Sequence, residues 1–584
     1  MDIKHTCHSE RSEESRYHQV GVTEILPPFG RLNDNKLKTK IMKKYVWLLL
    51  ALCLPMGFVA CSDSGDEPLK PVVKPDDSQE EEEEETSKAY QNEEAYVNFF
   101  SFNMMSDIYL WKKEIADALK SWQLLEDPIE AVAKYRYKNR FGEDVDKWTM
   151  ATDDYQGMVG GTDGEETGTY GCTYKFYLKE AGSDAIVAFV AYTYTDSPAE
   201  KAGLKRGDVV LTIDGKPLDK SNYTGLYYNP SVQLGVGHYK GNGVYSDVEK
   251  TVQMSAVSMY ENPVLMTKVF DCDGKKVGYL HYTSFTFESS LALYEACKQL
   301  KAEGISELIL DLRYNGGGYV FTENVLASML APQDVVSSKA ILSTEVWNDD
   351  YMEAFKEQGE DLNTYFTTEF KQTHNGKIYD INTADANLNL TKIYALVGEG
   401  TASASESVLV CLMPYMDIEV IGTRTHGKYC SGIMWSGEEW YQNVEDNYKE
   451  NGKSFAKEVP EFADWKKYMN NWGIYVMISM YADRDGKNPC MPSGIKPDVE
   501  AVDMIEEIYP LGDEREAMLH LALQRAGKTD LEARTESRSA VSIMPDKEIR
   551  LRRHVLEGRR IETRGEVRMP LGINNFGKKI AGTK

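Results

Sequence analysis

The sequence predicts a multidomain α+β protein, and its length and two changes of pattern along the chain support that prediction. A chain of 584 residues is too long for a single hydrophobic core, so several domains are expected. Apolar residues recur at helical spacing from about residue 89 to 160. Short strands with turns follow at residues 167–257, and strands alternate with helices at residues 258–525. We therefore expect a small N-terminal helical domain, a β-sandwich-like domain and a layered α/β domain, in that order.

The composition is that of an acidic, soluble globular protein. The hydrophobic fraction is 42% and the charged fraction 27%, both ordinary values. The formal net charge of −26 argues against nucleic acid as a partner. The sequence contains no G-x-G-x-x-G, no P-loop and no zinc-ligand spacing, so we expect neither a cofactor nor a metal.

The stretch "MKKYVWLLLALCLPMGFVAC", residues 42–61, has the layout of a bacterial secretion signal. Its apolar run is short for a spanning helix. The ending "FVAC" resembles a lipobox, which implies a signal peptide at residues 42–60 and lipid attached to Cys61; a plain signal peptide and a membrane anchor are the alternatives. Residues 1–41, polar and aperiodic, would then precede the native start at Met42. We expect a cell-envelope lipoprotein held at the outer membrane, on either the periplasmic or the surface face.

Two segments have the composition of unfolded chain. Residues 61–88 contain prolines, serines and six consecutive glutamates, which predicts a solvated acidic tether. Acidic residues behind a lipidated cysteine resemble the surface-export signal of Bacteroidetes lipoproteins. Residues 526–584 are polar, rich in arginine and without an apolar face, so we expect a basic, disordered tail.

Six cysteines follow the predicted lipidated Cys61. Export would permit disulfides, but the spacing shows neither a disulfide framework nor a C-x-x-C metal pair. Cys297 and Cys411 lie in apolar, helix-like runs and are predicted to be buried thiols.

The stretch "SPAEKAGLKRGDVVLTIDGKPL", residues 197–218, reads as a short helix ending near Gly203, a turn, a buried strand and a second tight turn. It resembles a PDZ domain of secreted proteases. PDZ domains bind an extended C-terminal peptide by strand addition and hold its carboxylate on backbone N–H groups. The resemblance places that carboxylate loop near residues 169–178, although the sequence there departs from the usual Gly-x-Gly-Φ motif. The candidate peptide-binding residues are Gly171, Cys172, Thr173 and Tyr174.

Two strands of the α/β region end in glycine-rich turns. In "VGEGTASASESVLVCL", residues 397–412, Ser403 and Glu406 have the S-x-x-E spacing of a capping box, which by itself accounts for a helix start. In "LDLRYNGGG", residues 310–318, a buried strand runs into glycines whose N–H groups can approach a ligand. Strand ends of a parallel sheet meet at one edge, where ligands bind. A serine beside fixed N–H donors is the minimum for acyl transfer through an oxyanion.

A serine nucleophile needs a base, and "GTRTHGKYCSG" supplies two candidates, His426 and Lys428. Histidine is the commoner base. Lysine serves where desolvation lowers its pKa toward neutrality. By itself, a Gly-Lys pair after a strand is usually a solvated hairpin turn.

Together these stretches resemble the S41 serine peptidases, the C-terminal (tail-specific) processing proteases, over residues 167–525. The family's order is a PDZ domain, a D-L-R-x-N-x-G-G strand turn, a T-A-S-A-S-E serine motif and a G-K motif. Here "DLRYNGGG", "TASASE" and "HGK" occur in that order. In the family the first serine of its motif is the nucleophile and the lysine follows 25 residues later, which is the spacing of Ser403 and Lys428.

The resemblance implies a ClpP/crotonase-like layered α/β peptidase domain with a Ser–Lys dyad. Ser403 would attack the scissile carbonyl, and neutral Lys428 would take its proton and pass one to the leaving amine. The N–H of Ala404 and that of Gly317 or Gly318 would hold the oxyanion. Asp311 and Arg313 are expected to brace the loop rather than take part in the chemistry.

The chain departs from the family pattern at Gly432, where relatives often carry a glutamine that helps to orient the lysine. Glu406 is a candidate for that role because some relatives use a glutamate, although its capping role ranks higher. His426 is an alternative base. Which group orients Lys428 is left open by the sequence.

We expect a serine endopeptidase of the cell envelope, with a PDZ domain that selects or gates polypeptide substrates, for instance through their C-termini. The alternative is an inactive relative that acts as a peptide-binding scaffold. It is motivated by Gly432 and by the irregular loop at residues 169–178.

Overall fold

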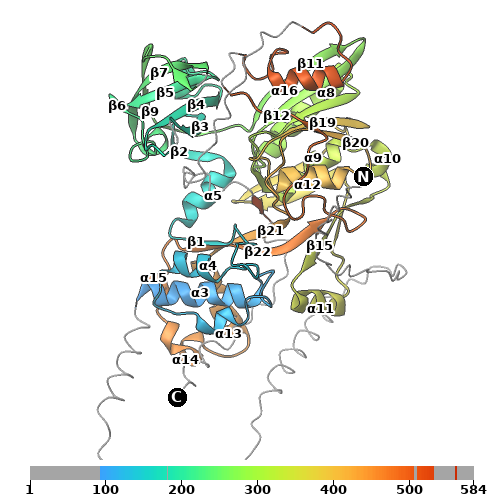
Figure 1. Cartoon of the computed structure of the whole chain (residues 1–584). Helices are drawn as coiled ribbons and strands as arrows, with labels where there is room; N and C mark the ends of the chain where they lie inside the picture. Colours follow the sequence, from blue (N-terminus) through green and yellow to red (C-terminus); the bar gives the residue numbers. More distant parts are fainter. Residues whose placement is uncertain (1–91, 180–181, 242, 506–508, 532–558, 562–584) are drawn as a thin grey trace, which may run out of the picture. The chain divides into compact units, whose positions relative to one another are not determined.

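The computed structural model describes residues 92–179, 182–241, 243–505, 509–531 and 559–561, all within one unit of the chain, residues 76–584 (Figure 1). The predicted upstream extension, signal peptide, lipidated Cys61 and acidic tether lie outside the described residues. Within the described ranges, every helix is too short or too polar to cross a membrane.

The N-terminal helices share a core with the α/β region instead of forming the separate small domain that we predicted. Asn92 caps the first helix, and its side chain accepts a hydrogen bond from the N–H of Ala95 at 3.0 Å. It is buried on nearly every side, and Phe99 stacks on Phe462 with ring centres 3.9 Å apart. A helix buried on nearly every side has to be enclosed, and its apolar residues share one hydrophobic core with those of the α/β region. The elements are α3 (Glu93–Asp107), η1 (Ala118–Ser121), α4 (Pro128–Tyr135), β1 (Met150–Thr152) and α5 (Tyr155–Asp163).

The region with the PDZ-like sequence folds around its own hydrophobic core. Its sheet has the order β3-β4-β5-β7-β8, with β6 on β5 and β9 on β7, and the strands β2 and β10 pair where the chain enters and leaves. The predicted short helix and buried strand are present, and Gly203 takes a φ of 74°. The elements are β2 (Glu165–Thr169), β3 (Cys172–Leu178), β4 (Ile186–Thr193), α6 (Pro198–Lys201), β5 (Asp208–Ile213), β6 (Lys216–Pro217), α7 (Gly225–Tyr228), β7 (Ser231–Gly241), β8 (Val244–Tyr245), β9 (Lys250–Ser255) and β10 (Val257–Tyr260).

The α/β region is built on a sheet with the order β11-β12-β13-β19-β20-β23, parallel except for the β11–β12 pair. One face packs in the same core as α8, α9 and α12, and α16 covers the other face (Figure 1). The predicted amphipathic helix is α8, which ends at Gly304 with a φ of 74°. The elements are β11 (Val264–Cys272), β12 (Lys275–Tyr282), α8 (Ser289–Glu303), β13 (Glu307–Asp311), α9 (Val320–Leu330), β19 (Lys392–Val397), α12 (Ala404–Leu412), β20 (Asp417–Gly422), β23 (Val499–Glu500) and α16 (Ala517–Arg525).

This topology brings the three sequence motifs to one edge of the sheet. The strands β13, β19 and β20 are parallel neighbours, and each motif follows the carboxyl end of one of them. Ligands of open α/β sheets bind at this edge.

A second sheet, with the order β14-β24-β21-β22-β15-β16 and β1 on β22, extends the α/β region. Its strand β24 comes from the tail that we predicted to lack structure. A polar segment without an apolar face can still form a strand, because strand pairing needs only backbone groups. The remaining elements are β14 (Gly317–Tyr319), α10 (Gln333–Ser337), β15 (Ile341–Trp347), α11 (Asp349–Gln358), β16 (Asn363–Tyr365), β17 (Glu369–His374), β18 (Lys377–Asn382), β21 (Cys430–Ser436), α13 (Gly437–Glu450), α14 (Phe455–Glu458), η2 (Pro460–Phe462), α15 (Trp465–Tyr468), β22 (Gly473–Ala482) and β24 (Arg559–Ile561).

The cysteines of the described part are all buried and none forms a disulfide, which confirms the prediction that Cys297 and Cys411 are buried thiols.

Candidate active site

Ser403 stands between β19 and α12 in a strained conformation, with φ 62° and ψ −115°. Positive φ is rare for residues other than glycine, and such strain gathers at functional sites. The residue is fully buried, and its hydroxyl has no hydrogen-bond partner. Because an unsatisfied buried polar group costs about 1–3 kcal/mol, stability alone does not explain this serine.

Glu406 joins the loop that carries Ser403 (residues 398–403, the serine loop) to the loop that carries Lys428 (residues 423–429, the lysine loop). Its Oε2 accepts the N–H of Ser403 at 2.8 Å and that of Lys428 at 2.9 Å. Its Oε1 accepts the N–H of Gly427 at 2.7 Å and the hydroxyl of Thr425. Burial raises the pKa of Glu406 above its ordinary value, although these donors oppose the shift. The backbones of Ser403 and Lys428 therefore flank a single carboxylate oxygen.

The capping-box prediction holds on the glutamate side. Ser403 and Glu406 have the arrangement of a capping box, and the Glu406 carboxylate accepts the Ser403 N–H. The reciprocal bond from the Glu406 N–H to the Ser403 hydroxyl lacks hydrogen-bond geometry, since that hydroxyl has no partner. The serine side chain is thus not used to cap the helix.

Lys428 is fully buried and its amine is held between aromatic rings. Its Nζ donates to the hydroxyl of Tyr475 at 2.7 Å and lies 5.7 Å from the ring centre of Trp148. Because the Ser403 hydroxyl has no partner, neither Lys428 nor His426 is hydrogen-bonded to it in this structure.

Tyr475 occupies the space that a side chain at position 432 would need. Gly432 lies on β21 beside β22, and a Cβ there would be 2.4 Å from Cε of Met477 and 2.6 Å from Cε2 of Tyr475. The tyrosine hydroxyl accepts a hydrogen bond from the amine of Lys428. The sequence analysis missed Tyr475; the signal was a glycine where the family often has a glutamine, which requires the partner to come from a neighbouring strand.

His426 is engaged elsewhere. Its Nε2 accepts the indole N–H of Trp148 at 3.4 Å, and its backbone N–H donates to the carbonyl of Thr401 at 2.9 Å. These contacts tie the lysine loop to the serine loop and to the N-terminal segment.

The two candidate oxyanion donors differ in their hydrogen bonds within residues 312–318, the glycine loop. The N–H of Gly317 donates to Oδ1 of Asn315 at 2.9 Å. The Gly317 carbonyl and the Tyr319 N–H both bond Phe285, so β14 turns those two groups toward Phe285. In an extended strand alternate residues turn their N–H and C=O to opposite sides, so the N–H of Gly318 faces away from Phe285. The geometry therefore favours Gly318 over Gly317.

Gly318 also has to be glycine. Its φ is 146°, and a Cβ there would lie 2.3 Å from the carbonyl oxygen of Phe285. This close approach fixes the turn that aims its N–H.

The glycine loop and the serine loop are bonded to each other. The carbonyl of Asn315 accepts the N–H of Ala402 at 3.1 Å and the hydroxyl of Ser405 at 3.0 Å. The hydroxyl of Thr401 donates to the carbonyl of Leu312 at 2.8 Å. Ala404 follows as the first residue of α12, where a helix leaves its N–H groups without intrahelical partners.

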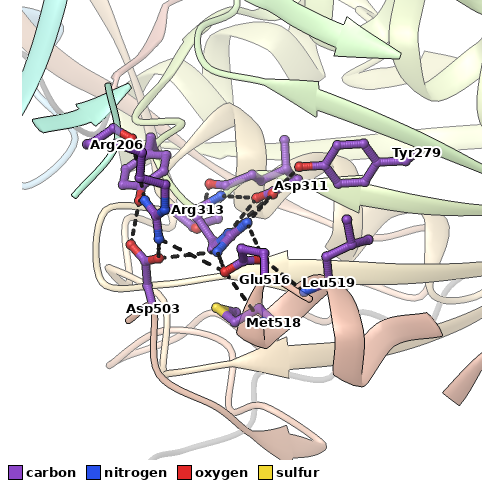
Figure 2. A network of polar contacts seen from close by, with 12 residues as sticks. Arg206, Tyr279, Asp311, Arg313, Asp503, Glu516, Met518 and Leu519 are labelled. Carbon is purple, nitrogen blue, oxygen red and sulfur yellow. Dashed lines mark hydrogen bonds and ion pairs between the residues drawn. The ribbon is translucent and has the colours of Figure 1, made fainter. Parts of the chain in front are cut away.

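Asp311 and Arg313 form part of a buried ionic network (Figure 2). The Arg313 guanidinium bonds Asp311 at 2.6 Å and Glu516 at 2.8 Å, and it reaches Asp503 at 3.2 Å. Glu516 in turn caps α16, accepting from the N–H groups of the first turn. The network braces the end of β13 immediately ahead of the glycine loop.

The network continues into the PDZ-like region through Arg206. This arginine contacts Asp503 at 2.5 Å (Figure 2). It also donates to the hydroxyl of Tyr314 at 2.7 Å. Lys175 of β3 also reaches Asp503, at 2.7 Å. Burial alone would raise the pKa of Asp503, but Arg206, Lys175 and Arg313 outweigh it and hold that pKa well below its usual range. The sequence analysis did not find Asp503, because nothing local marks an acid in a loop.

The candidate peptide-binding loop of the PDZ-like region is tightly packed. Cys172 and Tyr174 are buried, and a Cβ on Gly171 would be 2.4 Å from Cβ of Ser197. β3 lies at the edge of its sheet, but the N–H of Tyr174 donates to the hydroxyl of Tyr227, on α7, at 3.3 Å. Thr173, between them, is half-buried. One donor that an added peptide strand would need is thus already bonded.

Among the described residues, no group of three or more histidine, cysteine, aspartate or glutamate side chains is placed to hold a metal ion.

Known proteins resemble the chain in both regions. A model described as peptidase family S41 matches residues 276–501, and a model described as a PDZ domain matches residues 189–225. The chain is 27% identical over 262 residues to the chloroplastic C-terminal processing peptidase of Tetradesmus obliquus, covering 42% of this chain and 48% of that protein. It is 26% identical over 255 residues to the carboxy-terminal processing protease CtpB of Bacillus subtilis, covering 43% and 45%. The chain spans about half the length of these curated relatives.

A solved structure shows the same fold. A protein from Bacteroides fragilis, described as an S41 protease, aligns with a TM-score of 0.55 at 24% identity, over 74% of this chain and 97% of that one.

Proposed function

From the premise that this chain belongs to peptidase family S41 and carries a PDZ domain, we propose that it is a serine endopeptidase that cleaves polypeptides with a Ser403–Lys428 dyad. The observation that carries the proposal is that one carboxylate oxygen of Glu406 accepts hydrogen bonds from the backbone N–H groups of both Ser403 and Lys428. No fold requirement explains a buried, strained serine with an unpartnered hydroxyl beside a buried lysine.

We propose the following reaction. Ser403 Oγ attacks the scissile carbonyl while the neutral amine of Lys428 takes the hydroxyl proton. The N–H groups of Ala404 and Gly318 stabilise the oxyanion. Lys428 then passes the proton to the leaving amine, and water hydrolyses the acyl-enzyme by the same route.

The base has to be uncharged and must reach the serine. Full burial disfavours the ammonium form of Lys428. In this structure its Nζ is bonded to Tyr475, so substrate binding is proposed to turn the amine from the tyrosine hydroxyl toward Ser403. Catalytic hydrogen bonds commonly tighten only in the substrate complex.

The PDZ domain is proposed to select or gate substrates. The support is the contact of Arg206, in the PDZ domain, with Asp503 and Tyr314, next to the loop that carries Gly318. Movement of the PDZ domain would change the bracing of that loop. The free edge of β3 is the proposed place for a polypeptide, with Tyr227 displaced from the N–H of Tyr174.

The proposal is tested by hydrolysis of an unfolded, C-terminally tagged polypeptide by the wild type and by Ser403→Ala and Lys428→Ala. Both variants are expected to lose activity by a factor of at least about 100, since nucleophile and base are each essential. Cleavage by both variants at the wild-type rate would show that the dyad is wrong.

The alternative function is an inactive, peptide-binding scaffold. It is favoured by the absence of a hydrogen bond between the Ser403 hydroxyl and Lys428. Binding of the tagged polypeptide by the wild type, with no cleavage after hours, would support the scaffold instead.

We also propose that the protein is a cell-envelope lipoprotein attached to the outer membrane through Cys61. The support is the signal-like residues 42–61. Metabolic labelling with a radioactive fatty acid should mark the wild type and not Cys61→Ser. Any peptide from residues 1–41 in the mass spectrum of the mature protein would contradict a start at Met42.

A further inference from the structure

A strand from the chain's own tail lies between two strands that carry the catalytic loops. The backbone of β24, Arg559–Ile561, pairs in parallel with β14, setting Gly318 opposite Arg560. It also pairs in parallel with β21, setting Gly432 opposite Ile561. β14 contains the proposed oxyanion donor, and β21 begins two residues after Lys428.

The tail strand lies on the reactive side of the glycine strand. Gly317 and Tyr319 turn their paired backbone groups to Phe285, so Gly318 turns its N–H and C=O to the opposite side. That opposite side is where β24 runs. An oxyanion donor has to point at the scissile bond of its substrate. A strand that pairs with β14 at Gly318 is therefore where the backbone of a substrate would lie.

We propose that Arg559–Ile561 occupies the substrate strand of this active site in cis and competes with polypeptide substrates. The proposal rests on the proposed peptidase function and adds its regulation. Strand addition takes its affinity from main-chain hydrogen bonds, so a polar, arginine-rich segment can bind as well as an apolar one. A tethered segment is present at its site at an effective concentration on the order of millimolar. Even weak strand pairing is then enough to keep the site occupied.

The test uses the full chain with Ser403→Ala, which cannot cleave, so occupancy is measured without turnover. The probe is a fluorescein-labelled peptide with the sequence of residues 553–567, RHVLEGRRIETRGEV. Fluorescence polarisation gives its Kd for three proteins: Ser403→Ala alone, with Arg560→Pro, and with Asn574→Pro. Proline cannot sit within a central strand, so Arg560→Pro should empty the site. Asn574→Pro is a matched control elsewhere in the tail.

The expected result is a Kd at least about tenfold lower for the Arg560→Pro protein than for the other two, because the cis competitor is removed. Equal Kd values in all three proteins, or no binding of the probe to any of them, would overturn the proposal.

With Ser403 intact, Arg560→Pro should lower the KM for an unfolded polypeptide and leave kcat unchanged. The two proposals fail separately. A wild type without hydrolysis contradicts the peptidase but leaves the binding comparison readable. Equal binding contradicts the tail strand while hydrolysis continues.

Discussion

The amine of Lys428 donates a hydrogen bond of 2.7 Å to the hydroxyl of Tyr475, 47 residues along the chain. We propose that this contact orients the lysine in a chain with glycine at position 432. The tyrosine ring lies where a side chain at position 432 would be, and its hydroxyl accepts the hydrogen bond from the amine.

Tyr475→Phe should lower kcat by about 10- to 100-fold with little change in KM, because a base that has lost its orienting bond loses part of the 10²–10⁴-fold that general-base catalysis contributes. The matched control is Tyr441→Phe, which removes a buried hydroxyl bonded to the carbonyl of Tyr96 at 2.9 Å, away from the site. Steady-state kinetics on a peptide substrate compare the two. Equal kcat in both variants would remove Tyr475 from its orienting role.

Gly318→Ala should abolish hydrolysis, since its Cβ would lie 2.3 Å from the carbonyl oxygen of Phe285 and the loop must shift. Gly398→Ala is the control, because its Cβ would find its nearest atom at 3.7 Å, an ordinary contact. Activity and thermal unfolding are measured for both. A Gly318→Ala enzyme with wild-type kcat/KM would exclude this glycine as an oxyanion donor.

Arg206→Ala should lower kcat/KM for a long polypeptide by about tenfold or more, because removing one cation from a buried ionic network leaves the charge of Asp503 less fully compensated and rearranges its surroundings. Of its charged partners, Asp503 would keep Lys175 and Arg313. The exposed neighbour Lys205 gives the control, Lys205→Ala. Unchanged kinetics in Arg206→Ala would argue against coupling of the PDZ domain to the glycine loop.

The stability of the protein should fall at acid pH through the same network. Burial would raise the pKa of Asp311, but the charge of Arg313 outweighs it and holds that pKa at about 2, below the ordinary 3.8. A carboxyl with a depressed pKa stabilises the fold above its ordinary pKa, and this contribution is lost as pH falls through the folded value. Asp503 acts in the same direction.

We therefore expect the free energy of unfolding to decline between about pH 4 and pH 2. Chemical denaturation at each pH measures this decline. Asp503→Asn should flatten part of this decline. Stability that rises as pH falls through this window would contradict the assignment.

Local motifs carried much of the prediction, and their limits are physical. The end of α8 at Gly304 follows from a glycine that can take positive φ, and the strand–turn–helix around Ser403 follows from glycines and an S-x-x-E spacing. The predicted independence of the N-terminal helices did not hold, because apolar spacing shows that a helix face is buried but not what buries it. The choice between Gly317 and Gly318 also required the pairing of β14 with Phe285.

By itself, the sequence determined the order of the regions, the two glycine turns, and Ser403 and Lys428 as the pair to consider, because each is written in a short run of residues whose backbone conformation depends on its neighbours. Only the tertiary structure decided that Glu406 seats both residues, that Tyr475 holds the amine, that Asp503 links Arg206 to Arg313, and that Arg559–Ile561 pairs beside Gly318. Those contacts join residues far apart in the chain, and their partners are chosen by packing and strand register, which no local spacing encodes.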